Sequence, residues 1–86
     1  MADDMRKRRE ARSMLLRAIY DTAEGSVTEF VSAHELAAAQ GVAQAETGRI
    51  LAYLEEKGFL LVDDHRAGIV RITAEGVDAV ELGKLN

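Results

Sequence analysis

The chain's 86 residues are 48% hydrophobic and 30% charged, with a formal net charge of −4 and no cysteine. This composition is typical of a single globular domain, here expected over residues 1–86, and it excludes disulfides and thiolate chemistry. No apolar run approaches the ~18 residues that are needed to cross a bilayer, so we expect a cytoplasmic protein without membrane contact.

The first predicted element is a helix over residues 5–23. Its apolar stripe follows the i, i+3, i+4 spacing of one buried helix face and consists of Ala11, Met14, Leu15, Ala18, Ile19 and Thr22. Gly25 follows the stripe, and it suits the left-handed backbone conformation that commonly ends a helix.

This first helix also carries most of the basic side chains. Residues 1–17 hold six basic side chains against three acidic ones, a net charge of +3, and the remaining residues hold five against twelve, a net charge of −7. A basic end that includes Lys7 and Arg8 fits a local contact with phosphate, a contact with an acidic partner, or a solvated helix face.

A minor strand and a short helix are predicted next. Residues 27–31 are rich in β-branched and aromatic side chains, which favours a strand. Ser32 and Glu35 form the Ser-x-x-Glu capping-box pattern, which predicts the start of a helix over residues 33–40.

After Gly41, the periodicity predicts a third helix over residues 43–57. Its two faces are distinct. The expected core face consists of Thr47, Ile50, Leu51 and Leu54, and the expected solvent face consists of Gln44, Ala45, Gly48, Arg49 and Ala52. Gly58 is expected to stop the helix.

Two short apolar runs, residues 59–62 and 69–72, flank a polar turn and predict an antiparallel hairpin. Thr73 is then expected to cap a final helix over residues 74–85, with Val77, Val80 and Leu85 on one side. The predicted fold class is therefore α+β and mainly α.

Three motifs in these elements resemble the winged helix-turn-helix superfamily, in particular the MarR-like and PadR-like bacterial regulators and small phage-type winged-helix proteins. The motifs are Gly41-Val42, the run from Arg49 to Leu60 with the sequence RILAYLEEKGFL, and Ile72-Thr73-Ala74-Glu75-Gly76. The resemblance implies a three-helix core, a β-hairpin wing and a C-terminal helix. It also implies a small DNA-binding transcriptional regulator that places the third helix, 43–57, in the major groove with the wing at 59–72.

Carried over to this sequence, the family pattern assigns the base-reading positions to the solvent face of the third helix. These positions are Gln44, Ala45, Gly48 and Arg49, with His65 and Arg66 at the wing tip near the minor groove or backbone. Gln44 can pair with adenine and Arg49 with guanine. Lys7 and Arg8 are expected to contact phosphate only. Since residues 43–58 carry a net charge of −1 and the wing contains two aspartates, we expect a modest affinity for double-stranded DNA.

The sequence leaves one alternative function open, an acidic winged-helix protein–protein interaction module without intrinsic DNA binding. In either case we expect a homodimer through the first and last helices, with Tyr53 beside the core or at the dimer seam. No enzyme, cofactor or metal site is predicted. His34-Glu35 lacks the second histidine of a His-Glu-x-x-His zinc motif because residue 38 is alanine, so His34 is expected to be a surface residue. The turn residues Asp63-Asp64-His65 are expected to be solvated.

Overall fold

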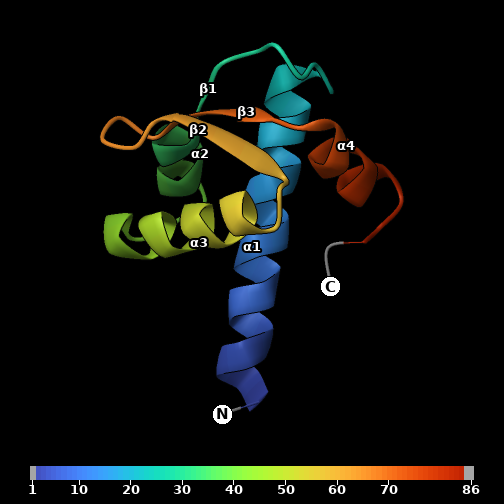
Figure 1. The fold of residues 1–86 in the computed structure, drawn as a ribbon. Coiled ribbons are helices and arrows are strands. Elements are labelled where there is room, and N and C mark those ends of the chain that lie inside the picture. The colour runs from blue at the N-terminus through green and yellow to red at the C-terminus, as the bar shows by residue number, and fades with distance from the viewer. Residues whose placement is uncertain (1, 85–86) are drawn as a thin grey trace.

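Residues 2–84, which the computed structural model describes, form four helices and one three-stranded antiparallel sheet (Figure 1). In chain order the elements are α1 (Ala2–Ala23), β1 (Val31–Ser32), α2 (Ala33–Ala39), α3 (Gln44–Glu56), β2 (Leu60–Asp64), β3 (Ile69–Ile72) and α4 (Ala74–Glu81). The prediction of an α+β, mainly helical fold with a hairpin after the third helix and a C-terminal helix is confirmed. None of the helices in the described residues is long and apolar enough to span a membrane.

The central element is α1, which contacts the three other helices and the sheet. Its N-terminal half extends beyond the body of the molecule (Figure 1), and residues 2–10 are all exposed. The helix begins at Ala2 rather than at residue 5. Asp3 and Asp4 lie in its first turn, where negative charge is favourable, and Asp3 forms a 2.8 Å ion pair with Arg6.

The buried stripe of α1 differs from the predicted one. Leu15, Leu16 and Ile19 are fully buried, whereas Met14 is 53% exposed and Thr22 is also exposed. The buried residues of α1 still form a single stripe, made of Leu15, Leu16, Ile19 and Ala23. It is rotated around the helix toward Leu16 and away from Met14, because the other elements pack against that side.

The strand predicted over residues 27–31 is mostly wrong, because only Val31 of that segment belongs to β1. Val27 and Thr28 lie in a turn, in which the Ser26 hydroxyl accepts a hydrogen bond from the Thr28 backbone N–H at 3.3 Å. Local side-chain hydrogen bonds of this kind compete with strand pairing. Val27 is consequently exposed.

Two of the predicted helix boundaries are confirmed by their hydrogen bonds. The Ser32 hydroxyl accepts from the Glu35 backbone N–H at 3.4 Å at the start of α2. At the end of α3, Gly58 has a φ of +79° and the Phe59 N–H reaches back to the Leu54 carbonyl at 2.9 Å. This left-handed glycine turns the chain directly into β2.

The sheet has the strand order β1-β3-β2, so β3 is central. Its inner face contributes Leu60, Val70 and Ile72 to the core, and Val62 pairs with Val70 in register. A bulge between Val62 and Asp64 precedes the turn at residues 65–68.

Thr73 caps α4, as predicted, by accepting a hydrogen bond from the Gly76 backbone N–H at 3.0 Å. Its hydroxyl also donates to the Gly58 carbonyl at 2.5 Å, which joins α4 to the end of α3. Val80 is buried and Val77 is half-buried. The helix ends at Glu81 rather than at residue 85, and Leu85 lies outside the described residues.

Candidate nucleic-acid interface

The predicted faces of α3 are confirmed by burial. Thr47, Ile50, Leu51 and Leu54 are its buried residues. All four predicted base-reading positions, Gln44, Ala45, Gly48 and Arg49, are exposed. At Gly48, a Cβ atom would have no other atom within 4 Å. This part of α3 is therefore open to close approach by another molecule.

Three grooves flank α3, and five of the predicted site residues line them. Gln44 lies with His34 and Thr47 in a groove between α2 and α3. Gly48 and His65 line a second groove between α3 and the hairpin, and Arg8 and Arg49 line a third between α1 and α3. The structure thus places Gln44 and Arg49, the two side chains predicted to read bases, in different grooves.

The hairpin-side groove has a volume of about 110 Å³. His65 turns toward α3, and its Nε2 atom lies 3.6 Å from the Glu55 carboxylate, an ion pair when the imidazole is protonated. Glu55 and Ala52 complete the α3 side of this groove. Of the two residues predicted at the wing tip, His65 therefore lies near α3, although its side chain is 76% exposed.

The hairpin turn is stabilised by Asp64. Its carboxylate accepts hydrogen bonds from the backbone N–H groups of Arg66 and Ala67, both at 3.0 Å. Arg66 is exposed at the tip, as predicted. Beneath the turn, the imidazole of His34 packs so tightly against Gly68 that a Cβ at Gly68 would overlap it. His34 is therefore half-buried, and the expectation of a surface histidine is corrected.

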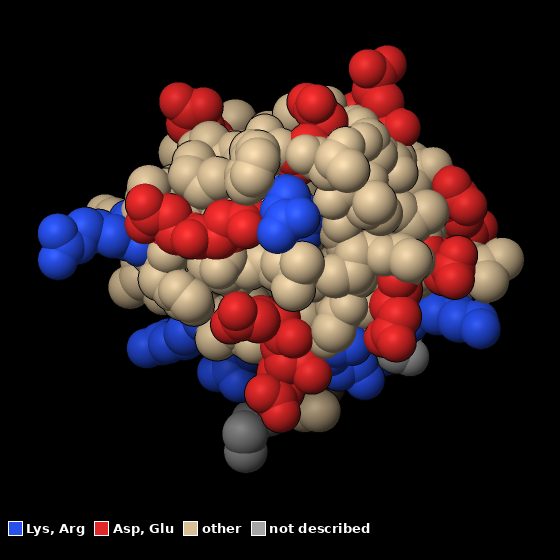
Figure 2. All heavy atoms as spheres, turned by 45° about the horizontal axis from the view of Figure 1, so that its top comes forward, with Lys and Arg blue, Asp and Glu red and all other residues tan. Residues whose placement is uncertain are grey.

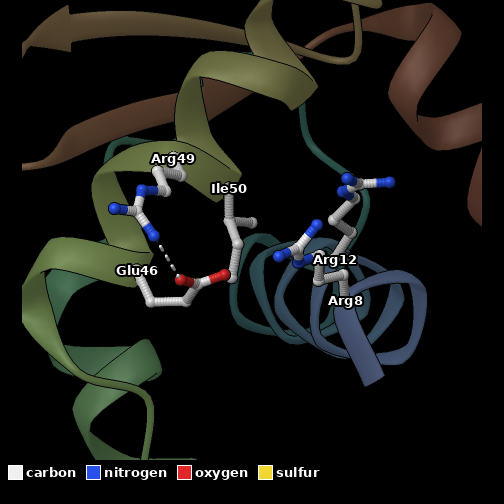
Figure 3. A pocket seen from close by; sticks show the side chains of 5 residues that line it. All are labelled: Arg8, Arg12, Glu46, Arg49 and Ile50. Carbon is white, nitrogen blue, oxygen red and sulfur yellow. Dashed lines mark hydrogen bonds and ion pairs between the residues drawn. The ribbon is translucent and has the colours of Figure 1, made fainter. Parts of the chain in front are cut away.

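The groove between α1 and α3, which we call the α1–α3 notch, has a volume of about 320 Å³ and is lined by Arg8, Arg12, Glu46, Arg49 and Ile50 (Figure 3). Arg8 and Arg12 extend from α1 on one side. Glu46 and Arg49 extend from α3 on the other, where they form a 3.3 Å ion pair. Lys7, although adjacent to Arg8 in sequence, is not among the lining residues.

Arg12 was not predicted as a site residue. Its guanidinium carbon lies 3.9 Å from the ring centroid of Tyr53, in a cation–π contact between α1 and α3. Tyr53 is 37% exposed. The signal that could have found Arg12 is its spacing, because it follows Arg8 by four residues and precedes Leu15 and Leu16 by three and four. These residues share one helix face.

The outer face of the sheet has a different character. Arg71 donates two hydrogen bonds to Asp63, at 2.9 and 3.0 Å, and its guanidinium lies 5.3 Å from the Phe30 ring centroid. The hydrogen bonds from Arg71 lower the pKa of the Asp63 carboxyl and raise the pKa of Arg71 itself. Phe30 and Leu61 are 64% and 49% exposed. In the view of Figure 2, acidic side chains are spread over a largely uncharged surface, and most of the visible basic side chains lie at its margins.

Within residues 2–84, no group of three or more His, Cys, Asp or Glu side chains has a geometry that could hold a metal ion. Asp63 and Asp64 are instead engaged with Arg71 and with the backbone of the turn.

In comparisons with known proteins, no family model matches the chain, and neither does a curated protein or a solved structure.

Proposed function

We propose that this protein is a small transcriptional regulator of the winged helix-turn-helix type, which places α3 in the major groove of double-stranded DNA and uses the β2–β3 hairpin as a wing. The observation that carries the proposal is the exposed face of α3. It presents all four predicted base-reading residues, and it lies between the basic N-terminal half of α1 and the hairpin turn.

The side chains on this face suit close approach to base pairs. Ala45, Gly48 and Ala52 are small and exposed, so the α3 backbone can enter deeply between the phosphate strands. Gln44 and Arg49 are the longer polar side chains beside them and can pair with adenine and guanine, respectively. Arg66 at the hairpin tip is free of ion pairs among the described residues and can reach the DNA backbone.

The charges also predict how the affinity is distributed. Glu46, Glu55 and Glu56 lie on α3 and repel phosphate. The basic residues of α1 must therefore supply most of the sequence-independent attraction, because contacts with phosphate release condensed counterions. We expect a modest affinity that falls steeply as the salt concentration rises.

The proposal is tested by the binding of a fluorescent random-sequence duplex pool, followed by selection of a preferred sequence. Arg49→Ala should weaken the preferred duplex by about 1–3 kcal/mol and affect random duplex less. Arg8→Ala should weaken all sequences alike and reduce the salt dependence. If the wild-type protein does not bind the pool at low salt, the proposal is wrong.

We also propose that the protein is a homodimer through α1 and α4. This is supported by apolar side chains that the single chain leaves exposed, Met14 on α1 and Leu82 at the end of α4. Val80 does not contribute, because the core of the same chain already buries it. A two-fold dimer would bind two half-sites related by the same symmetry.

A second candidate function is a protein-interaction module without intrinsic DNA binding. The exposed Phe30 and Leu61 on the outer sheet face favour it, because apolar side chains within an acidic surface are suited to an apolar partner with a basic rim. Two results together would support this candidate over the first. The duplex pool would not bind, and a protein partner would bind in a way that Leu61→Ser abolishes.

A further inference from the structure

The inner face of α1 changes its chemistry along the helix. From Leu15 to Ala23 it is apolar and packs into the core, and one turn earlier the same face carries Arg12 and then Arg8. A helix face that continues into solvent usually becomes mixed in character. Here it becomes basic at the place where α1 passes α3, and both arginines line the α1–α3 notch on the side opposite Glu46 and Arg49 (Figure 3).

The guanidinium of Arg12 is held in place before any ligand binds. It stacks on the Tyr53 ring at 3.9 Å, and the aromatic face occupies one face of the planar cation. The N–H groups lie at the edge of that plane, so the stack leaves them able to donate hydrogen bonds. A stacked arginine loses less side-chain freedom on binding an anion than a solvated one does.

The notch also contains one carboxylate. Glu46 pairs with Arg49 at 3.3 Å, and in Figure 3 its side chain lies between Arg49 and the two arginines of α1. Arg8, Arg12 and Arg49 give the notch three positive charges against the one negative charge of Glu46. The excess positive charge favours an anion from solvent, and the Glu46 carboxylate competes with that anion.

We infer that the α1–α3 notch is a phosphate site, in which Arg8 and Arg12 bind one phosphodiester group of the same duplex whose major groove receives α3. This inference rests on the proposed function and adds Arg12 and Tyr53 to the interface. It also separates Arg8, which lies in the notch, from Lys7, which does not. Planar guanidinium groups suit this ligand because two of their N–H donors match two oxygens of a phosphate.

In this arrangement Glu46 limits the affinity. An incoming phosphodiester must share the notch with its carboxylate, so removal of that negative charge should strengthen binding. If Arg8 and Arg12 are merely solvated basic residues distant from the ligand, the gain from Glu46→Gln should be just as large when Arg12 is also replaced by Gln.

The test uses the full chain and measures the binding of a fluorescent duplex pool by anisotropy over about 50–200 mM salt. Arg12→Gln should weaken binding and reduce the slope of log K against log salt by about 0.9, the value for one lost phosphate contact. Arg17→Gln is the matched control, because Arg17 is exposed on the opposite face of α1 and loses the same charge. It should leave the slope unchanged apart from a small long-range effect.

Glu46→Gln should raise the affinity about two- to fivefold, which is the range expected for one exposed charge interaction. Glu29→Gln, in the exposed segment before β1, is the control for loss of a glutamate charge. Thermal unfolding of each variant separates these effects from a loss of folded protein.

The outcomes distinguish the two proposals. If the wild-type protein binds duplex but Arg12→Gln and Arg17→Gln behave alike, the phosphate site is wrong and the DNA-binding function stands. If Glu46→Gln and Glu29→Gln raise the affinity equally, the gain reflects net charge alone, and the notch is again not the site. If the wild-type protein binds no duplex, both proposals fail together.

Discussion

The hydroxyl of Tyr20 donates a 2.6 Å hydrogen bond to the carboxylate of Glu81, which joins α1 to the last turn of α4 across 61 positions of sequence. The bond raises the pKa of Tyr20 above its ordinary value of 10.0, since the hydroxyl must stay protonated to donate. Because the pKa is raised in the folded state, the contribution of this bond to stability is fully present at neutral pH. It is lost as the pH rises through the folded-state pKa.

We therefore predict that Tyr20→Phe lowers the melting temperature at neutral pH by a small amount, and that the difference from the wild type disappears above the pKa of Tyr20. The tyrosinate absorbance of the wild type minus that of Tyr20→Phe reports this pKa directly. An ordinary pKa for the Tyr20 hydroxyl in the folded protein would contradict the prediction.

The ion pair of Asp63 with Arg71 predicts an acid-dependent effect. The pKa of Asp63 is lowered below its ordinary value of 3.8. Its contribution to stability is therefore complete above the unfolded-state value and is lost as the pH falls through the lower folded-state value. In urea unfolding at several pH values, Asp63→Asn should be less stable than the wild type near pH 7, and the two should converge in strong acid. A stability difference that is independent of pH would show that the charge of Asp63 is not responsible.

Two helical glycines should respond in opposite ways to the same substitution. Gly48→Ala adds a methyl group to open space and should raise the free energy of unfolding by about 0.5–1 kcal/mol. Gly76→Ala would press the methyl group against the Phe59 carbonyl and against Ile72 Cγ1 at 2.7 Å. It should lower the free energy of unfolding by about 1–3 kcal/mol. Chemical denaturation measures both.

Gly48→Ala also tests the proposed contact with DNA, because it should be better folded and yet bind duplex less well if α3 approaches base pairs closely at this position. Unchanged duplex affinity in the stabilised variant would show that nothing packs against Gly48.

The proposed dimer predicts a sedimentation coefficient that increases with concentration over the micromolar range. Met14→Glu should shift the equilibrium toward the monomer, because it places a charge in the apolar part of the interface. Met14 is 53% exposed in the single chain, so the monomer should keep its stability. A wild-type protein that is still monomeric at tens of micromolar would rule out the dimer.

The elements that the sequence predicted best are those with strong local signals. The four core residues of α3 and the caps at Ser32 and Thr73 could be assigned because helical periodicity and capping depend on residues three or four apart. Leu16 was left out of the predicted buried stripe and Val27 was wrongly assigned to a strand, for the opposite reason. Whether Leu16 is buried depends on the side from which other elements pack against α1, and whether Val27 joins a strand depends on pairing with β3, which is about forty residues away.

The same limit applies to the candidate site. The exposed face of α3 was predictable from its own periodicity, whereas the α1–α3 notch requires the crossing of two helices. Arg12 and Tyr53 are 41 positions apart, and neither has a neighbour in sequence that indicates the contact. The difference between Arg8 and Lys7 depends on the direction of each side chain from α1.

Because α1 runs without interruption from the notch into the core, the two ends of the helix are related by a fixed rotation. One residue inserted between Ser13 and Met14 would turn Arg8 and Arg12 by about 100° around the helix axis and direct them away from α3. Seven inserted residues, nearly two full turns, would restore their direction but carry them about 10 Å farther from the core. Insertion length alone can therefore separate the orientation of the two arginines from their position, without replacing any residue of the chain.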